Sequence, residues 1–539
     1  MSNEKTPKKQ TFLQGAAILA MATIIVKLLG FAFKVPLNNT IGKLGNSYFY
    51  TAYKVYDVLL MISTTGLPVA MSRMISEAQT LENYAQIQKI YKTARYVFLT
   101  IGIVGMLGML LFCRQLSVMV TTNENSWAAI AALSPCVLLV CVISAYRGFF
   151  QGQSNMSPTS ISQIFESVIR LVVGLGAAWF IMRKTGSAIY AAGGAICGVS
   201  LGSLVSALYL RRQFKASNGV LSRSGGQAKS TRATMKELLA IAVPITLGAA
   251  GLQLINLFDT MIYMRRLTGA LGYSETLADG LKGIYDFQLT VFALPCALIT
   301  PITISSIPNI TSYLTAKNFD GARRTEESAI RVMGLIALPC TIGLVVLGTP
   351  IVDLLCTAYT PEDVAVGGRI LSILGFCVLS NSMVLVFNAM MQAHGDVTTP
   401  VINMLIGGVV KVIVNYILVA VPSLNIVGAP IGTLVCYTSI AVLDLIAMRR
   451  SVTTRPAVWR NIIRPAVASV LMGVCAWLSY QLLTRVVAST SVACLGAVVI
   501  AVVAYAVLIV VLQCVTYEDC MLLPKGEKIA KLLHIKQKT

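Results

Sequence analysis

Charged residues inside long apolar segments are the residues of this sequence that could do chemistry. An ionisable group in the middle of a membrane costs about 2.5 to 3.5 kcal/mol on insertion scales, so it normally faces a bundle interior or a wet cavity. Eight residues are candidates for such a cavity: Lys27, Lys54, Asp57, Glu166, Arg170, Asp259, Asp286 and Lys411. The cations suit an anionic ligand, whereas the aspartates Asp57, Asp259 and Asp286 could bind a coupling ion or a proton.

Each candidate also has a purely structural interpretation. Glu166 and Arg170 are spaced i, i+4 on one helix face and could neutralise each other, as Lys54 and Asp57 could at i, i+3. The aspartates could be polar caps on kinked helices. Lys27 and Lys411 have no local acid, so contact with a ligand is favoured for these two lysines.

The segment that carries Glu166 and Arg170 recurs in the second half of the chain. Residues 147–174 and 388–415 align without gaps with four identities, and Arg170 falls on Lys411. Both segments read as the end of an apolar helix, a turn, and the start of a second apolar helix with a cation in its middle. This pattern indicates internal duplication.

A second pair of segments supports the duplication. Tyr56 and Asp57 in one half correspond to Tyr285 and Asp286 in the other. Each pair is expected on the second helix of its half, and a polar segment leads from each of these helices into the next span. The order of elements therefore repeats as well as the motif.

The composition predicts what these helices are. The chain has 539 residues, of which 56% are hydrophobic and only 12% charged, and its mean hydropathy is +0.75. Such values are typical of a polytopic membrane protein. A span needs about 20 apolar residues, and the hydropathy predicts an all-α protein with fourteen transmembrane helices.

The predicted helices fall into two six-helix lobes. Residues 1–210 are the N-terminal lobe, 211–237 a basic, flexible cytoplasmic linker, 238–450 the C-terminal lobe, and 451–539 helices 13 and 14 with a basic tail. Six is an even number, so the two lobes are expected to be parallel repeats. Helices 13 and 14 fall outside the repeat and should pack peripherally.

The net charge of +21 follows the predicted topology. With fourteen spans and an inside N-terminus, every basic cluster falls on the cytoplasmic side of the plasma membrane, as the positive-inside rule requires. Both termini are then cytoplasmic. The charge indicates attraction to anionic membrane lipids rather than to nucleic acid.

Cysteines and histidines do not suggest catalysis. The thirteen cysteines lie mostly in apolar runs without C-x-x-C spacing, and the two histidines, His394 and His534, lie outside the spans. We therefore expect no metal, no Ser/His/Asp site and no enzyme. No cofactor is expected beyond coupling to the membrane potential, Na+ or H+.

Three motifs carry a family resemblance. FLQGAAILAMATIIVKLLGF (12–31), TTGLPVAMSRMISEA (64–78) and RGFFQGQSNMSPTSISQIFESVIRL (147–171) resemble the stage V sporulation protein B and polysaccharide-exporter branch of the multidrug/oligosaccharidyl-lipid/polysaccharide (MOP) superfamily. The chain is similar, more distantly, to MurJ-type lipid II flippases and, in architecture, to multidrug-and-toxin extruders. The resemblance implies a V-shaped pair of six-helix lobes around a cavity, and a lipid-linked oligosaccharide as cargo. In the MurJ group two additional helices line a groove for the lipid tail, which implies this role for helices 13 and 14.

The cations expected from the MurJ pattern are partly replaced. Lys27 falls at the earlier cation position of the first helix, while Phe33 falls at the later one with Lys34 beside it. At the two positions of the second helix where the MurJ pattern has an arginine pair, this sequence has Leu60 and Met61. Lysine is a point charge and cannot bind pyrophosphate bidentately as arginine does.

Three functions remain open at this point. The first is a flippase for an undecaprenyl-pyrophosphate-linked envelope precursor, with lipid II favoured and a teichoic acid, capsular or spore-cortex intermediate as alternatives. The second is a cation-coupled multidrug extruder, in which the aspartates matter and the cations do not. The third is a non-transporting scaffold for envelope synthesis enzymes, which would tolerate the loss of every cavity charge. The cationic bias and the two additional helices favour the first.

Overall fold

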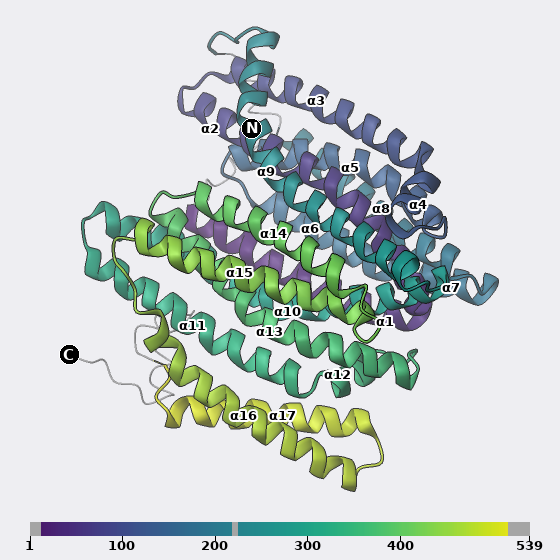
Figure 1. The fold of residues 1–539 in the computed structure, drawn as a ribbon. Helices are drawn as coiled ribbons and strands as arrows, with labels where there is room; N and C mark the ends of the chain where they lie inside the picture. The colour runs from purple at the N-terminus through teal and green to yellow at the C-terminus, as the bar shows by residue number, and fades with distance from the viewer. Residues whose placement is uncertain (1–11, 218–224, 516–539) are drawn as a thin grey trace, which may run out of the picture. The chain divides into compact units, whose positions relative to one another are not determined.

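The structure is a computed structural model that describes residues 12–217 and 225–515, and these residues are almost entirely helical (Figure 1). The all-α fold predicted from the sequence is confirmed. The elements are α1 (Phe12–Met61), η1 (Ile62–Gly66), α2 (Leu67–Thr80), α3 (Tyr84–Leu111), α4 (Cys113–Thr121), α5 (Trp127–Gly152), α6 (Ser157–Ile169), η2 (Arg170–Gly174), α7 (Leu175–Thr185), α8 (Ala188–Ala216), α9 (Thr231–Arg265), η3 (Arg266–Ala270), α10 (Glu275–Thr315), α11 (Phe319–Val346), α12 (Gly348–Leu355), α13 (Pro361–Ala393), α14 (Thr398–Leu418), η4 (Asn425–Val427), α15 (Gly428–Ser451), α16 (Val458–Val486) and α17 (Thr490–Val511).

Thirteen helical segments among the described residues are long and apolar enough to cross a membrane. The first of them, Met21–Thr80, is 60 residues long, which is roughly 90 Å of helix at 1.5 Å per residue and far more than a bilayer needs. Gly42 interrupts it with a φ of 68°, a conformation that glycine adopts without strain. Counting the two arms separately would give the predicted fourteen spans, a number that stays a prediction.

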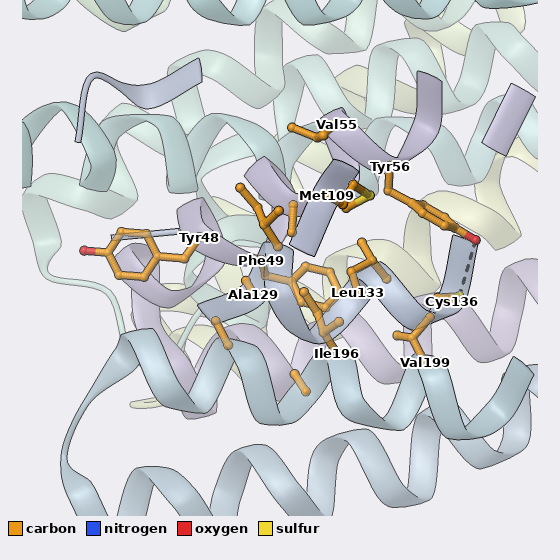
Figure 2. Close-up of a cluster of buried hydrophobic side chains, with 14 of the residues drawn as sticks. Tyr48, Phe49, Val55, Tyr56, Met109, Ala129, Leu133, Cys136, Ile196 and Val199 are labelled. Carbon is orange, nitrogen blue, oxygen red and sulfur yellow. Dashed lines mark hydrogen bonds between the residues drawn. The ribbon is translucent and has the colours of Figure 1, made fainter. Parts of the chain in front are cut away.

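The helices belong to two compact units, residues 1–283 and 284–539. In the first unit α5 packs along α3 and α8, and the α6–η2–α7 segment packs on α8. Figure 2 shows the apolar core that results, with side chains of α5 facing those of α1 and α8. The predicted lobe boundaries stay a prediction.

The spacing of apolar residues explains the central place of α5. Ala129, Leu133, Cys136 and Val140 recur at intervals of three or four residues, so they form one stripe along the helix, and all four are buried. The Tyr56 hydroxyl lies 3.4 Å from the Cys136 sulfur within this core (Figure 2). A mostly apolar stripe thus contains a polar contact close to the charged residues described below.

In the second unit α13 packs on α11 and α15, and α14 packs on α15. Helices α16 and α17 lie side by side and pack against α11 and α12 (Figure 1). Small residues allow the close approach: Ala476 and Ala497 are fully buried in this contact, and a Cβ on Gly473 would lie 2.3 Å from the Ile342 side chain.

The order of elements repeats, as the sequence predicts. Helices α3 and α11 both contain 28 residues, and each is followed by a short helix and then by a long central one. Both begin with the same cap, because Asn83 accepts a hydrogen bond from the Gln86 amide and Asn318 accepts one from the Gly321 amide. The duplication therefore extends to the details of a helix start.

Part of the predicted linker, residues 211–237, is helical, and its role as a flexible linker stays a prediction. Helices α8 and α9 continue into it from both sides. Residues 225–230 bind the turn between α2 and α3, where the Lys229 amide donates to Gln86 Oε1 over 2.8 Å. Residues 218–224, on which the prediction of flexibility mainly falls, lie outside the described residues.

Candidate functional site

A partly buried group of three charges lies where α5 approaches α6. Glu166 accepts from Arg147 over 3.4 Å and from Arg170 over 3.2 Å, so two guanidiniums share one carboxylate. The side chains of Arg147 and Glu166 are each 16% exposed, and that of Arg170 is 23% exposed. One positive charge is in excess, and the partial exposure of Arg170 gives a ligand a way to reach it.

Local geometry fixes these three side chains. Arg147 Nε also donates to Ser162 Oγ over 3.1 Å, which holds the end of α5 against the start of α6. Arg170 begins η2, a single π-helical turn, and such turns occur often at functional sites. Within the described part of the chain, Arg170 Nε is buried without a hydrogen-bond acceptor. The bond to Glu166 therefore leaves part of the donor capacity of Arg170 unused.

Two glycines of α8 allow the helix that carries the charges to lie close. A Cβ on Gly202 would lie 2.6 Å from the Glu166 carbonyl oxygen, and one on Gly198 would lie 2.3 Å from the Gly174 nitrogen. Real Cβ atoms do not approach backbone atoms so closely. Glycine at these two positions is therefore what lets α6 and η2 pack directly on the α8 backbone.

Two tyrosines of α1 line the same region. The rings of Tyr53 and Tyr56 are 6.0 Å apart, and the charges that act on Tyr53 include those of Arg170, Glu166 and Asp57. The Tyr56 hydroxyl contacts Cys136. Tyr53 is therefore within electrostatic reach of both the arginine group and Asp57.

Asp57 forms the second part of the group. Lys54 and Lys34 are the cations that act on it, and Lys34 also lies 5.0 Å from the centre of the Tyr50 ring. Asp57 is thus near two cations, its i, i+3 neighbour Lys54 and also Lys34, which precedes the break at Gly42. We call Lys34, Lys54, Asp57, Arg147, Glu166 and Arg170 the N-terminal charge cluster.

Three further sequence-predicted residues differ in exposure. Lys27 has an exposed side chain on α1, and none of the described contacts joins it to the N-terminal charge cluster. Asp259 on α9 and Asp286 on α10 are each 2% exposed. Tyr285, next to Asp286, shares a hydrogen bond of 3.0 Å with Thr433.

Lys411 is the counterpart of Arg170 in the second unit. Its side chain is half-buried on α14, and its charge acts on Tyr437 and Cys377. A glycine again permits the close packing, because a Cβ on Gly432 of α15 would lie 1.9 Å from the Asn415 side chain of α14. The two units thus share a cation near a tyrosine and a glycine contact beside it.

Sequence reasoning missed two parts of the polar interior. Arg147 lies in the quoted motif, but its place at the end of α5 gave no sign that it reaches Glu166. Asp279 is buried and accepts from Ser47 over 3.2 Å and from Asn123 over 2.8 Å. These contacts join residues 156 and 232 positions apart, which no local pattern reveals.

The geometry suits binding of an anion by arginine and lysine. Among the described residues, no group of three or more His, Cys, Asp and Glu is placed to hold a metal ion. The fold and the charges together define a polytopic helical membrane protein with a partly open cationic site.

Comparison with known proteins gives the family. A model of the polysaccharide biosynthesis protein family matches residues 12–314, and a MatE family model matches residues 284–417. The first match covers more than half of the chain, so the chain belongs to the polysaccharide biosynthesis protein family, within the MOP superfamily.

Two curated relatives come from Bacillus subtilis (strain 168). The chain is 24% identical over 454 residues to the lipid II flippase MurJ, with 81% of this chain and 82% of the relative covered. It is 26% identical over 433 residues to stage V sporulation protein B, with 79% and 81% covered. The family resemblance in the three motifs is thereby confirmed.

A solved structure confirms the fold. The lipid II flippase MurJ in an inward closed conformation matches with a TM-score of 0.70 and 14% sequence identity, over 94% of this chain and all of that chain. At this identity the match concerns the fold alone. The chain is therefore a multi-pass membrane protein of the fold that MurJ adopts.

Proposed function

We propose that this protein is a flippase that moves an undecaprenyl-pyrophosphate-linked envelope precursor from the inner to the outer leaflet, with lipid II as the favoured cargo. The observation that carries the proposal is the pair of partly buried guanidiniums, Arg147 and Arg170, that share the single carboxylate of Glu166. An uncompensated charge inside a membrane protein is costly unless a ligand or water balances it. A pyrophosphate would supply the missing negative charge.

Each cation has a role in this proposal. Arg170 binds the pyrophosphate with the N–H groups that Glu166 leaves free, because a guanidinium pairs well with phosphate oxygens. Lys411 is the corresponding cation of the second unit and binds an anionic group there, and Lys27 attracts the headgroup from an exposed position. The two lobes then alternate between inward-open and outward-open states while the prenyl chain stays in the lipid.

The same proposal places the protein in the plasma membrane. Both termini are cytoplasmic, where the basic clusters face anionic lipids. The protein acts as a transporter rather than an enzyme, and it uses no bound cofactor. Movement of the charged headgroup is coupled to the membrane potential or to a Na+ or H+ gradient.

The test is growth of a cell depleted of its own lipid II flippase. Wild-type protein should restore growth, and the combined substitution Lys27→Ala, Arg170→Ala and Lys411→Ala should abolish rescue at equal membrane levels. A matched variant removes three exposed cations instead, Lys184→Ala, Arg265→Ala and Arg485→Ala, and should rescue growth. Rescue by the first triple variant would contradict the proposed role of these cations.

A cation-coupled multidrug extruder is the second candidate, supported by the MatE match to residues 284–417 and by the burial of Asp259 and Asp286. It predicts drug resistance on overexpression and a Na+ or H+ dependence that Asp57→Asn or Asp286→Asn removes. Resistance that survives the cation variant and is lost in these aspartate variants would favour the extruder over the flippase.

A further inference from the structure

The first unit contains a pocket, separate from the N-terminal charge cluster, near the end where α3 begins and α5 and α8 finish. Its volume is about 520 Å³. The residues that line it come from these three helices: Tyr91, Arg95, Phe98, Leu99, Val142, Ala145, Tyr146, Arg211, Phe214 and Lys215. The transport proposal uses none of them.

Aromatic rings form one wall of the pocket. Phe214 stacks on Tyr91 with ring centres 4.6 Å apart, and its ring centre is 5.3 Å from that of Tyr146. Phe149 packs edge-on to Phe214 at 4.9 Å. This cluster ties the three helices together and gives the pocket a fixed shape.

Three cations form the rim. Arg95, Arg211 and Lys215 are all exposed, and none of the described lining residues is acidic. The ring centres of Tyr91 and Tyr146 are 6.4 Å apart, and the Arg95 charge acts on the Tyr91 hydroxyl, so a cation and two phenol groups lie close together. The rim is therefore positive and rich in hydrogen-bond donors, which suits a phosphate group.

The pocket is amphipathic along the helices. Leu99 lies one helical turn after Arg95 on α3, and Val142 lies one turn before Tyr146 on α5. The two helices run in opposite directions at this contact, so both apolar residues lie farther from the helix ends than the polar ones. The pocket thus has a cationic outer part and an apolar inner part.

We propose that this pocket binds the phosphate of an anionic phospholipid from the surrounding leaflet. Basic pockets between the ends of transmembrane helices suit lipid headgroups, and aromatic rings are favoured at the membrane interface. Arg95, Arg211 and Lys215 contact the phosphate, the tyrosine hydroxyls donate to its oxygens, and an acyl chain lies along Leu99 and Val142. The site does not depend on which cargo the protein carries.

The test measures lipid binding to the purified full chain by native mass spectrometry. The probes are phosphatidylglycerol and phosphatidylcholine with identical acyl chains, and wild type should prefer phosphatidylglycerol. The pocket variant combines Arg95→Gln, Arg211→Gln and Lys215→Gln. It should weaken phosphatidylglycerol binding about tenfold or more, because each basic group near a membrane surface contributes measurably to the attraction, and should leave phosphatidylcholine binding unchanged.

A matched control removes three exposed cations from the same end of the same unit that do not line the pocket. Lys92→Gln, Arg212→Gln and Lys236→Gln change the net charge equally, and should leave phosphatidylglycerol affinity within about twofold of wild type. Equal losses in the two triple variants would overturn the proposal, since general surface charge would then explain the binding.

Single substitutions and a displacement experiment test the same pocket in two further ways. If the pocket variant does not fold, the single substitutions Arg211→Gln and Lys215→Gln at the end of α8 should each weaken phosphatidylglycerol binding about threefold to fivefold, and unchanged affinity in both would overturn it. Inorganic phosphate at millimolar concentration should not displace the lipid. Displacement would mean that the ligand is a free phosphate and would contradict the lipid assignment.

Discussion

Glu166 is the residue on which the N-terminal charge cluster depends, because Arg147 and Arg170 both pair with it. Removing one partner of a buried ion pair leaves the other charge without compensation, which costs more than the pair itself contributes. Here one substitution would leave two partly buried guanidiniums without the counter-charge that they share. The cluster is therefore sensitive to Glu166 in a way that surface pairs are not.

Glu166→Gln should lower the free energy of unfolding by about 3 kcal/mol, seen as a lower thermal midpoint of the detergent-purified protein. Arg170→Gln should cost less, since Arg147 still balances Glu166. Glu124→Gln is the control: its partner Arg114 is exposed, with side-chain exposures of 62% for Arg114 and 56% for Glu124, and exposed pairs contribute little. A midpoint for Glu166→Gln equal to that of Glu124→Gln would contradict this description of the cluster.

Asp396, in the turn between α13 and α14, provides a pH-dependent test. The Ser451 hydroxyl donates to it over 2.7 Å and the Thr399 amide over 3.1 Å, and the hydrogen bond from Ser451 is the main reason that its pKa lies below the usual 3.8. A lowered pKa in the folded protein means that the ionised form stabilises it. This contribution is present above the unfolded-state pKa and is lost as the pH falls through the folded-state value.

Between pH 6 and pH 3, the stability difference between wild type and Asp396→Asn should therefore stay constant at first and narrow only as the pH falls below about 4. Asparagine can still accept the hydrogen bond from the Thr399 amide, and Asn155 occupies the matching position of the first repeat. Its amide nitrogen cannot accept from the Ser451 hydroxyl, so the substitution removes that hydrogen bond together with the charge, and only the loss of charge depends on pH. The measurement is the thermal midpoint of both proteins across this pH range. A constant difference between them would show that the charge of Asp396 does not contribute.

At the residue scale the sequence predicted part of the candidate site. The i, i+4 spacing of Glu166 and Arg170 pointed to an ion pair, and that pair is present. Arg147 was not predicted, since it comes from another helix and only the packing of α5 on α6 brings it to Glu166. Local spacing gives contacts within a helix, whereas contacts between helices need the fold.

At the scale of elements, close helix packing positions the charges. Gly198 and Gly202 are spaced i, i+4, so they lie on one face of α8, and this face meets α6 and η2. The helix that carries Glu166 rests directly on that face. A side chain on either glycine would push α6 and η2 away from α8 and would displace Glu166 and Arg170 with them.

Gly202→Ala should destabilise the protein by about 2 kcal/mol, because overpacking of a tight contact typically costs 1 to 3 kcal/mol. It should also reduce transport by displacing Glu166. Gly176→Ala on α7 is the control, since its Cβ would meet no atom within 4 Å and alanine favours a helix. The thermal midpoint should fall for Gly202→Ala and stay level or rise for Gly176→Ala; equal midpoints would contradict the packing argument.

The sequence was more informative about elements than about contacts. Hydropathy and the repeated motif predicted long apolar helices, and both the fold and the repeated order of elements agree. It did not predict that the break between the first two helices would be confined to Gly42, because the polar residues around this glycine are equally compatible with a longer loop. Nor did composition predict that residues 225–230 would bind the turn between α2 and α3.

At the scale of the whole molecule, the duplication gives each unit a mid-helix cation, Arg170 in one and Lys411 in the other. Lysine and arginine differ in how they bind pyrophosphate, since only arginine pairs bidentately. Arg170→Lys should therefore reduce transport several-fold, whereas Lys411→Arg should preserve it. The rate of transport by reconstituted protein measures both, and equal losses in the two variants would contradict the assignment of the bidentate contact to Arg170.

Movement of a lipid-linked, pyrophosphate-bearing sugar across the membrane is the activity that we propose for this protein. The most direct measurement is outer-leaflet exposure of lipid II in cells depleted of their own flippase and supplied with this protein. We predict that wild type restores exposure, and that the Lys27, Arg170 and Lys411 triple alanine variant does not at equal membrane levels. Failure of wild-type protein at normal membrane levels would contradict lipid II as the cargo, and exposure restored by the triple variant would contradict the cationic site.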